Sequence, residues 1–106
     1  MAEQQSRAQQ LVGGIAPKLA ELTDQVLFGD VWARQELSRR DRSLITVAAL
    51  TALCRTDQLR SHLGLALDNG VTREELSELA THLAFYAGWP AGISAATTLQ
   101  QVLNER

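Results

Sequence analysis

Cysteine is almost absent from this chain of 106 residues, which has only one, Cys54. A lone cysteine cannot form an intrachain disulfide, so the composition favours a reducing compartment and predicts a cytoplasmic protein. No apolar run approaches the roughly 20 residues that a membrane-spanning helix needs. The first residues, MAEQQSRAQQLVGG, lack the basic start and apolar core of a signal peptide, and we therefore expect no export.

An excess of positive charge is also missing. Ten Lys and Arg residues stand against twelve Asp and Glu, which gives a net charge of −2. Nucleic acids and anionic membranes attract clustered positive charge, so we expect neither as a partner. Aromatic residues make up only 5% of the chain, a composition that favours close-packed helices over sheets. The length suits one hydrophobic core, and a small helical domain with many apolar faces predicts a homo-oligomer.

The chain begins with a polar stretch that ends in Gly13-Gly14, and we predict a flexible N-terminal segment over residues 1–14. One helical domain is expected over residues 15–106. Its first helix carries apolar residues at helical spacing, starts around Pro17 and should end near Gly29. Trp32 is the expected apolar anchor of the connector that follows.

Four more helices follow from capping and turn signals. Ser38 predicts the start of a helix that runs to about Leu53 and is apolar on nearly every side, which is typical of a central helix. Thr56 or Asp57 can cap the next helix, which Gly70 should end. The other two are a helix begun by the capping box Thr72-Arg73-Glu74-Glu75 and a last helix from Pro90 to Asn104. No segment reads as a strand, so the predicted fold class is all-α, with about five helices.

Two histidines are the candidates for proton transfer, because imidazole titrates near neutral pH. His62 falls between Leu59 and Ala66 on an apolar helix face. It is either a core histidine bonded to a backbone carbonyl or a general acid or base in a pocket between helices. His82 shares a helix side with Glu75 and Glu78, either as a solvated pair or as an imidazole oriented by carboxylates at a subunit contact.

Arginines and the cysteine are weaker candidates. Arg39, Arg40 and Arg42 cluster at a helix start, as surface residues, interface ion pairs or clamps for a carboxylate. Cys54 has no CxxC partner and is expected to be a buried, small apolar side chain. The two histidines lie twenty residues apart without metal-ligand spacing, so we expect no metal. We expect no cofactor either, because the chain has no glycine-rich phosphate loop or dinucleotide fingerprint.

A family resemblance rests on four segments: VWARQELSRRDRSLITVAALTAL, LRSHL, DNGVTREEL and YAGWPA. Together they resemble the carboxymuconolactone decarboxylase family over roughly residues 25–100. The resemblance implies an all-helical fold of the alkyl hydroperoxidase D type. It also implies assembly into rings, as trimers or hexamers, with sites near the subunit contacts.

The same superfamily includes thiol peroxidases with the signature Cys-x-x-Cys-x-x-x-His and a glutamate one helix earlier. Placed on this chain, the histidine of that signature falls on His62 and the glutamate position on or near Ser43. The two cysteine positions fall on Arg55 and Gln58, so the disulfide that this chemistry uses cannot form. A peroxidase-like antioxidant protein is therefore kept as an alternative, together with a non-catalytic oligomer that binds a small ligand.

Similarity to the decarboxylase branch implies a cofactor-free enzyme that acts on a small anionic lactone of the 4-carboxymuconolactone type. Loss of carbon dioxide would push electrons into the lactone carbonyl, and a proton would then be delivered to carbon. On this reading His62 donates the proton and His82 makes a second polar contact. Arg42 and Arg39 bind carboxylates, and Ser43 lines the substrate site.

Overall fold

The computed structural model describes residues 5–106, and these form two compact units that divide between Leu37 and Ser38. Every regular element in the described residues is helical, which confirms the all-α prediction. Six α-helices are present among residues 5–106, one more than expected, together with a short π-helix and a 3₁₀ turn. No helix in this part of the chain is long and apolar enough to cross a bilayer.

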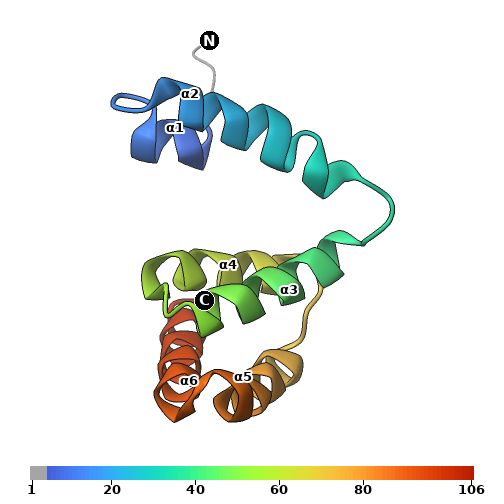
Figure 1. Cartoon of the computed structure of the whole chain (residues 1–106), viewed down its shortest axis with the longest axis vertical. Coiled ribbons are helices and arrows are strands. Elements are labelled where there is room, and N and C mark those ends of the chain that lie inside the picture. The colour runs from blue at the N-terminus through green and yellow to red at the C-terminus, as the bar shows by residue number, and fades with distance from the viewer. Residues whose placement is uncertain (1–4) are drawn as a thin grey trace. The chain divides into compact units, whose positions relative to one another are not determined.

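The first unit contains helix α1 (Arg7–Val12), helix α2 (Pro17–Leu22), the π-helix η1 (Thr23–Phe28) and the 3₁₀ turn η2 (Val31–Ala33) (Figure 1). Helix α1 is the unexpected one, because it lies in the segment predicted to be flexible. The Ser6 side chain explains it: its Oγ accepts a hydrogen bond from the Gln9 N–H at 3.1 Å and donates one to Asp24 at 2.8 Å. Residues 1–4 of the predicted segment lie outside the described residues.

The helix predicted from Pro17 to Gly29 is present, but it changes type halfway. Its first part is α-helical and its second part, from Thr23, is a π-helix. At the junction the Thr23 hydroxyl donates to the Leu19 carbonyl at 2.7 Å, a side-chain bond that competes with the regular helix ladder. Trp32 is buried and its ring lies 5.5 Å from that of Phe28, so the predicted anchor is confirmed.

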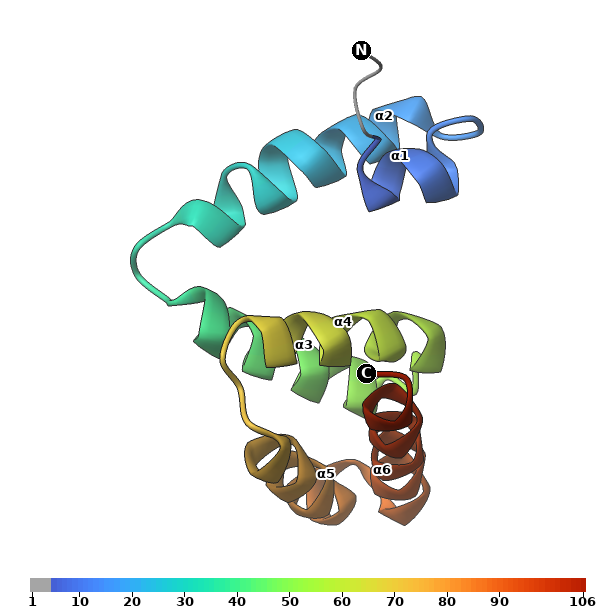
Figure 2. The same ribbon diagram turned by 180° about the vertical axis from the view of Figure 1, so that it is seen from behind.

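The second unit is a bundle of four helices, α3 (Arg39–Ala52), α4 (Thr56–Asp68), α5 (Arg73–Ala87) and α6 (Trp89–Asn104). All four match predicted helices. Helix α3 packs against each of the other three, as its largely apolar sequence suggested (Figures 1 and 2). Their inner faces, together with Val71 from the connector between α4 and α5, make one core of buried residues: Val47, Leu59, Leu63, Ala66, Val71, Leu76, Ala80, Ala95, Leu99 and Val102.

Helix ends in this unit follow the local sequence signals, with one exception. Ser38 caps α3, and the Thr72–Glu75 capping box starts α5 with both reciprocal hydrogen bonds present. Gly70 has φ +97°, the left-handed conformation expected after the end of α4. The exception is the start of α4, where neither Thr56 nor Asp57 is the cap. Arg55 occupies that position without a side-chain bond, and both predicted residues lie inside the first turn.

One buried hydroxyl in the core gives a stability prediction. Thr51 is 2% exposed, and its Oγ1 has no hydrogen-bond partner among residues 5–106. Replacing it with the isosteric valine removes a desolvated polar group, so Thr51→Val is expected to raise the free energy of unfolding by about 1 kcal/mol. Urea denaturation followed by circular dichroism measures this. Thr98→Val is the matched control, because the buried Thr98 hydroxyl donates to the Ser94 carbonyl at 2.7 Å. An equal gain in both variants would contradict the explanation.

Candidate functional site

His62 lies on the side of α4 that faces the core. Leu59, Leu63 and Ala66, which share its helix face, are all buried, as the apolar stripe predicted. The imidazole itself is half-buried, and its Nδ1 atom is shielded from solvent. Burial penalises the charged form and lowers the pKa of His62 below the ordinary value of 6.5. The ring is thus partly sheltered without being sealed, a setting that suits a group that gives up its proton.

Ser43 is buried in the contact between α3 and α4. Its Oγ accepts a hydrogen bond from Asn69 Nδ2 at 3.0 Å, which ties the beginning of α3 to the end of α4. The bond accounts for a serine inside an apolar interface, because a buried hydroxyl needs a partner. Because Ser43 is buried, its side chain could contact a substrate, as predicted, only if it became exposed.

His82 lies on α5 and is exposed. It lines a groove of about 450 Å³ between α3 and α5, together with Leu44, Ile45, Ala48, Glu75, Glu78, Leu79 and Leu83. The spacing of Glu75, Glu78 and His82 predicted that they share one side of the helix, and the groove confirms it. The His82 ring also lies 4.8 Å from the Tyr86 ring, at a tilt of 34°. His62 is not among the residues that line this groove, so the two histidines face different surroundings.

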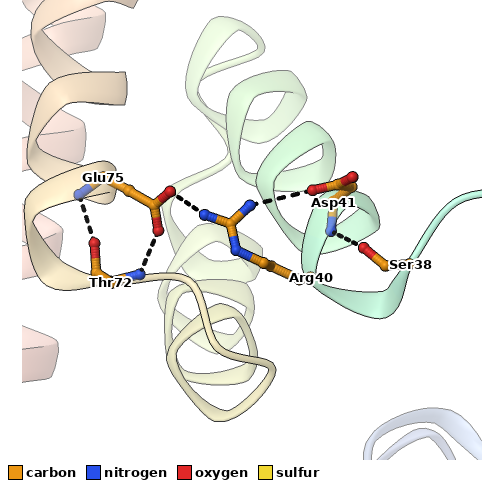
Figure 3. Close-up of polar contacts among 5 residues, drawn as sticks. All are labelled: Ser38, Arg40, Asp41, Thr72 and Glu75. Atoms are coloured by element: carbon orange, nitrogen blue, oxygen red, sulfur yellow. Dashed lines mark hydrogen bonds and ion pairs between the residues drawn. The ribbon is translucent and has the colours of Figure 1, made fainter.

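An ion-pair network surrounds Glu75, one of the residues that line the groove (Figure 3). Arg40, in the first turn of α3, donates hydrogen bonds to Glu75 on α5 and to Asp41 beside it, the latter at 3.1 Å. Glu75 also accepts from the Thr72 N–H at 2.9 Å as part of its capping box. The hydrogen bond from the Thr72 N–H has the largest effect on Glu75 and lowers its pKa, and the hydrogen bond from Arg40 lowers it further. Glu75 in turn raises the pKa of Arg40. Both groups are therefore charged at neutral pH.

The two arginines predicted to bind a carboxylate lie on either side of Arg40. Arg39 is exposed and Arg42 is half-buried, and neither lines the groove. Arg40, which was named only as a member of the cluster, is the one that reaches α5. The capping box identified Glu75 from the sequence, but the pairing of Glu75 with Arg40 depends on how α3 packs beside α5. No local signal could have supplied that.

The charge of the groove restricts what it can bind. Five of its lining residues are apolar, and the charged ones are the carboxylates Glu75 and Glu78. Arg40 compensates Glu75 and leaves Glu78 as the uncompensated charge in the lining. An anionic molecule would meet repulsion here unless an arginine enters the groove. The groove alone thus fits an apolar or cationic group better than a carboxylate.

The expectation for Cys54 was wrong in one respect: the thiol is exposed, not buried. Helix α3 ends at Ala52, and Cys54 lies in the turn after it with φ +57°, so its side chain does not continue the inner face of the helix. Among the described residues, no cluster of three or more His, Cys, Asp or Glu side chains is placed to hold a metal ion.

Residues 17–101 match the model of the carboxymuconolactone decarboxylase family. The chain belongs to that family. The match includes both histidines, the arginine cluster, helices α3 to α5 and most of α6, so the resemblance drawn from the four sequence segments is confirmed.

Two curated relatives are named as decarboxylases. The chain is 46% identical over 78 residues to 4-carboxymuconolactone decarboxylase of Acinetobacter baylyi, an alignment that covers 74% of this chain and 58% of the relative. It is 35% identical over 85 residues to nitrosuccinic acid decarboxylase of Metarhizium robertsii, which covers 80% of this chain and 59% of the relative. The chain thus spans less than two thirds of the length of either relative.

Proposed function

We propose that this member of the carboxymuconolactone decarboxylase family is a cofactor-free decarboxylase that acts on a small carboxylated lactone. The observation that carries the proposal is the 46% identity to 4-carboxymuconolactone decarboxylase over three quarters of the chain. Both relatives are named for removing carbon dioxide from an acid, and this supports the reaction class. The ring assembly and the cytoplasmic location expected from the sequence belong to the same proposal.

In the proposed reaction the bond between the ring carbon and the carboxylate breaks, and carbon dioxide leaves. The electron pair flows through the double bond into the lactone carbonyl, which becomes an enolate oxygen. Hydrogen-bond donors stabilise that oxygen, and a proton then adds to carbon to restore the neutral lactone. These steps balance without an oxidant, a metal or an organic cofactor.

His62 is the proposed proton donor. A half-buried imidazole with a lowered pKa releases its proton more readily than a solvated one, and partial shelter keeps water from competing for the carbanion. His82 is proposed for a second polar contact, since it reaches a groove large enough for a small molecule. Arg42 and Arg39 are proposed to hold the carboxylates, from the same copy or from a neighbour, because the groove has no arginine of its own in its lining.

The decisive experiment is to supply 4-carboxymuconolactone and follow the loss of its ultraviolet absorbance. We expect turnover by the 106-residue chain without any added metal or cofactor. Cys54→Ser is the matched control, and its turnover should equal that of the wild type because no step uses a thiol. Absence of turnover would reject this substrate, and hydroperoxide consumption that depends on Cys54 would favour the peroxidase alternative instead.

A further inference from the structure

A directional side-chain bond joins the start of α3 to the end of α4. Ser43, which is 0% exposed, accepts it from the Asn69 amide at 3.0 Å. Apolar contacts have no preferred direction, so two helices can bury nearly the same apolar area in several registers. A hydrogen bond inside such a contact is satisfied in one register only, and single polar groups fix the register of helix pairs in this way. Of the six buried residues on α3 and α4, four are apolar: Val47, Leu59, Leu63 and Ala66.

The backbone around Asn69 is held independently of its side chain. The Val71 N–H donates to the Ala66 carbonyl at 2.9 Å. The Gly70 N–H donates to the Leu67 carbonyl at 3.2 Å, and the two bonds together make a Schellman motif. Asn69 itself has φ −86° and ψ 5°, angles that any residue can adopt, so the end of α4 does not need the asparagine amide. The contribution of that amide is its bond to α3.

The two ends of this bond lie on the helices that carry the residues proposed to act on the substrate. Arg42 directly precedes Ser43 on α3. His62 comes seven residues before Asn69, and two turns of an α-helix span about seven residues, so the two share one side of α4. If α3 slid or rotated against α4, Arg42 would move with respect to His62.

We propose that Asn69 is a positioning residue for the decarboxylation, acting through Ser43 to fix the register of α3 against α4. This register sets how far the carboxylate-binding Arg42 lies from the proton donor His62. The inference rests on the proposed function, because both roles belong to it. The requirement is strict, since a misplacement of about 1 Å can lower a rate on the order of 10²-fold. It also gives Ser43 a role that its burial permits, which is to hold α3 in place instead of contacting the substrate.

The test compares Ser43→Ala, Asn69→Leu and the double variant with both changes. Each single change breaks the bond, so kcat/KM for 4-carboxymuconolactone should fall in both. Asn69→Leu should also lower the urea midpoint of unfolding, because the buried Ser43 hydroxyl loses its Asn69 partner. The double variant puts apolar groups on both sides and should regain the wild-type midpoint, while its kcat/KM stays on the order of 10- to 100-fold lower. Thr98→Val is the matched control, since it removes a buried hydrogen bond that lies within a single helix, and its kcat/KM should be unchanged.

A second measurement needs no turnover. The chain has two histidines, so in a His82→Gln background His62 gives the one imidazole signal in NMR spectra. Its pKa is lowered by burial, and a changed register alters what covers the ring, so this pKa should move when the double change is added. Recovery of kcat/KM in the double variant, an equal loss in Thr98→Val or an unmoved His62 pKa would overturn the inference. If the wild type shows no turnover, the proposed function fails, and the titration alone decides whether the bond fixes the register.

Discussion

Replacing His62 with glutamine is expected to lower kcat for 4-carboxymuconolactone by about 10²- to 10⁴-fold, the usual contribution of a positioned general acid. Glutamine keeps much of the size and polarity of imidazole but cannot deliver a proton to carbon. The loss should fall on kcat, because the proposed proton transfer occurs after the substrate is bound. Steady-state kinetics on the purified variant measure it.

His82→Gln is the matched comparison, because the structure gives the two imidazoles different surroundings. His82 is exposed in the groove, and its proposed role is a polar contact rather than proton transfer. Its replacement should mainly raise KM. A larger fall in kcat for His82→Gln than for His62→Gln would contradict the assignment. It would indicate that the proton donor is His82, in the groove between α3 and α5.

The pH dependence of the wild type follows from the lowered pKa of His62. A general acid must carry its proton, so kcat/KM should fall as pH rises through neutrality, by about tenfold per unit above the folded pKa. The free energy of unfolding changes with pH in the opposite direction. The unfolded chain binds this proton more readily, so stability rises with pH between the folded pKa and 6.5 and is full above that value. His62→Gln should lose that slope, which tests the burial of the ring separately from its role.

The helices of the second unit could be predicted because their ends are encoded locally. Ser38, the Thr72–Glu75 box and Gly70 act through bonds or backbone angles within a few residues, so they do not depend on packing. The errors lie where local signals are weak or compete. Helix α1 has a local cap, Ser6 bonded to the Gln9 N–H, but the two glycines that follow the helix led to the prediction of a flexible segment. Cys54 is exposed because α3 ends two residues before it.

In the candidate site, too, local features could be predicted from the sequence and features that depend on helix packing could not. Helical spacing placed Glu75, Glu78 and His82 on one side of α5, and the groove bears this out. The pairing of Arg40 with Glu75 joins residues 35 apart in the sequence and required the packing of two helices. The roles of His62, Arg39 and Arg42 come from the family resemblance and remain predictions. Each role concerns a step with bound substrate, so only kinetic measurements on the reaction test it.

Replacing Gly92 with alanine is expected to destabilise the second unit by about 1–3 kcal/mol, the range for overpacking a tight contact. A Cβ at this position would lie 2.7 Å from the Ala84 Cβ and 3.0 Å from the Ala80 carbonyl oxygen. Both obstacles belong to the α5 backbone or its first side-chain atom, so no flexible group can move aside. The helices would have to separate, and that would open the core between Ala80 and Ala95.

Gly64→Ala is the control with the opposite expected sign. Gly64 also lies inside a helix, but the nearest atom to its added Cβ is a guanidinium nitrogen of Arg106 at 3.6 Å, an ordinary contact. Without a clash, alanine gains roughly 0.5–1 kcal/mol from the smaller entropy of the unfolded chain. Urea denaturation of both variants gives the two signs directly. If Gly92→Ala were as stable as Gly64→Ala, α5 and α6 could not be packed as closely as the structure has them. The hollow of about 180 Å³ that Trp89 and Gly92 line would then have a different shape.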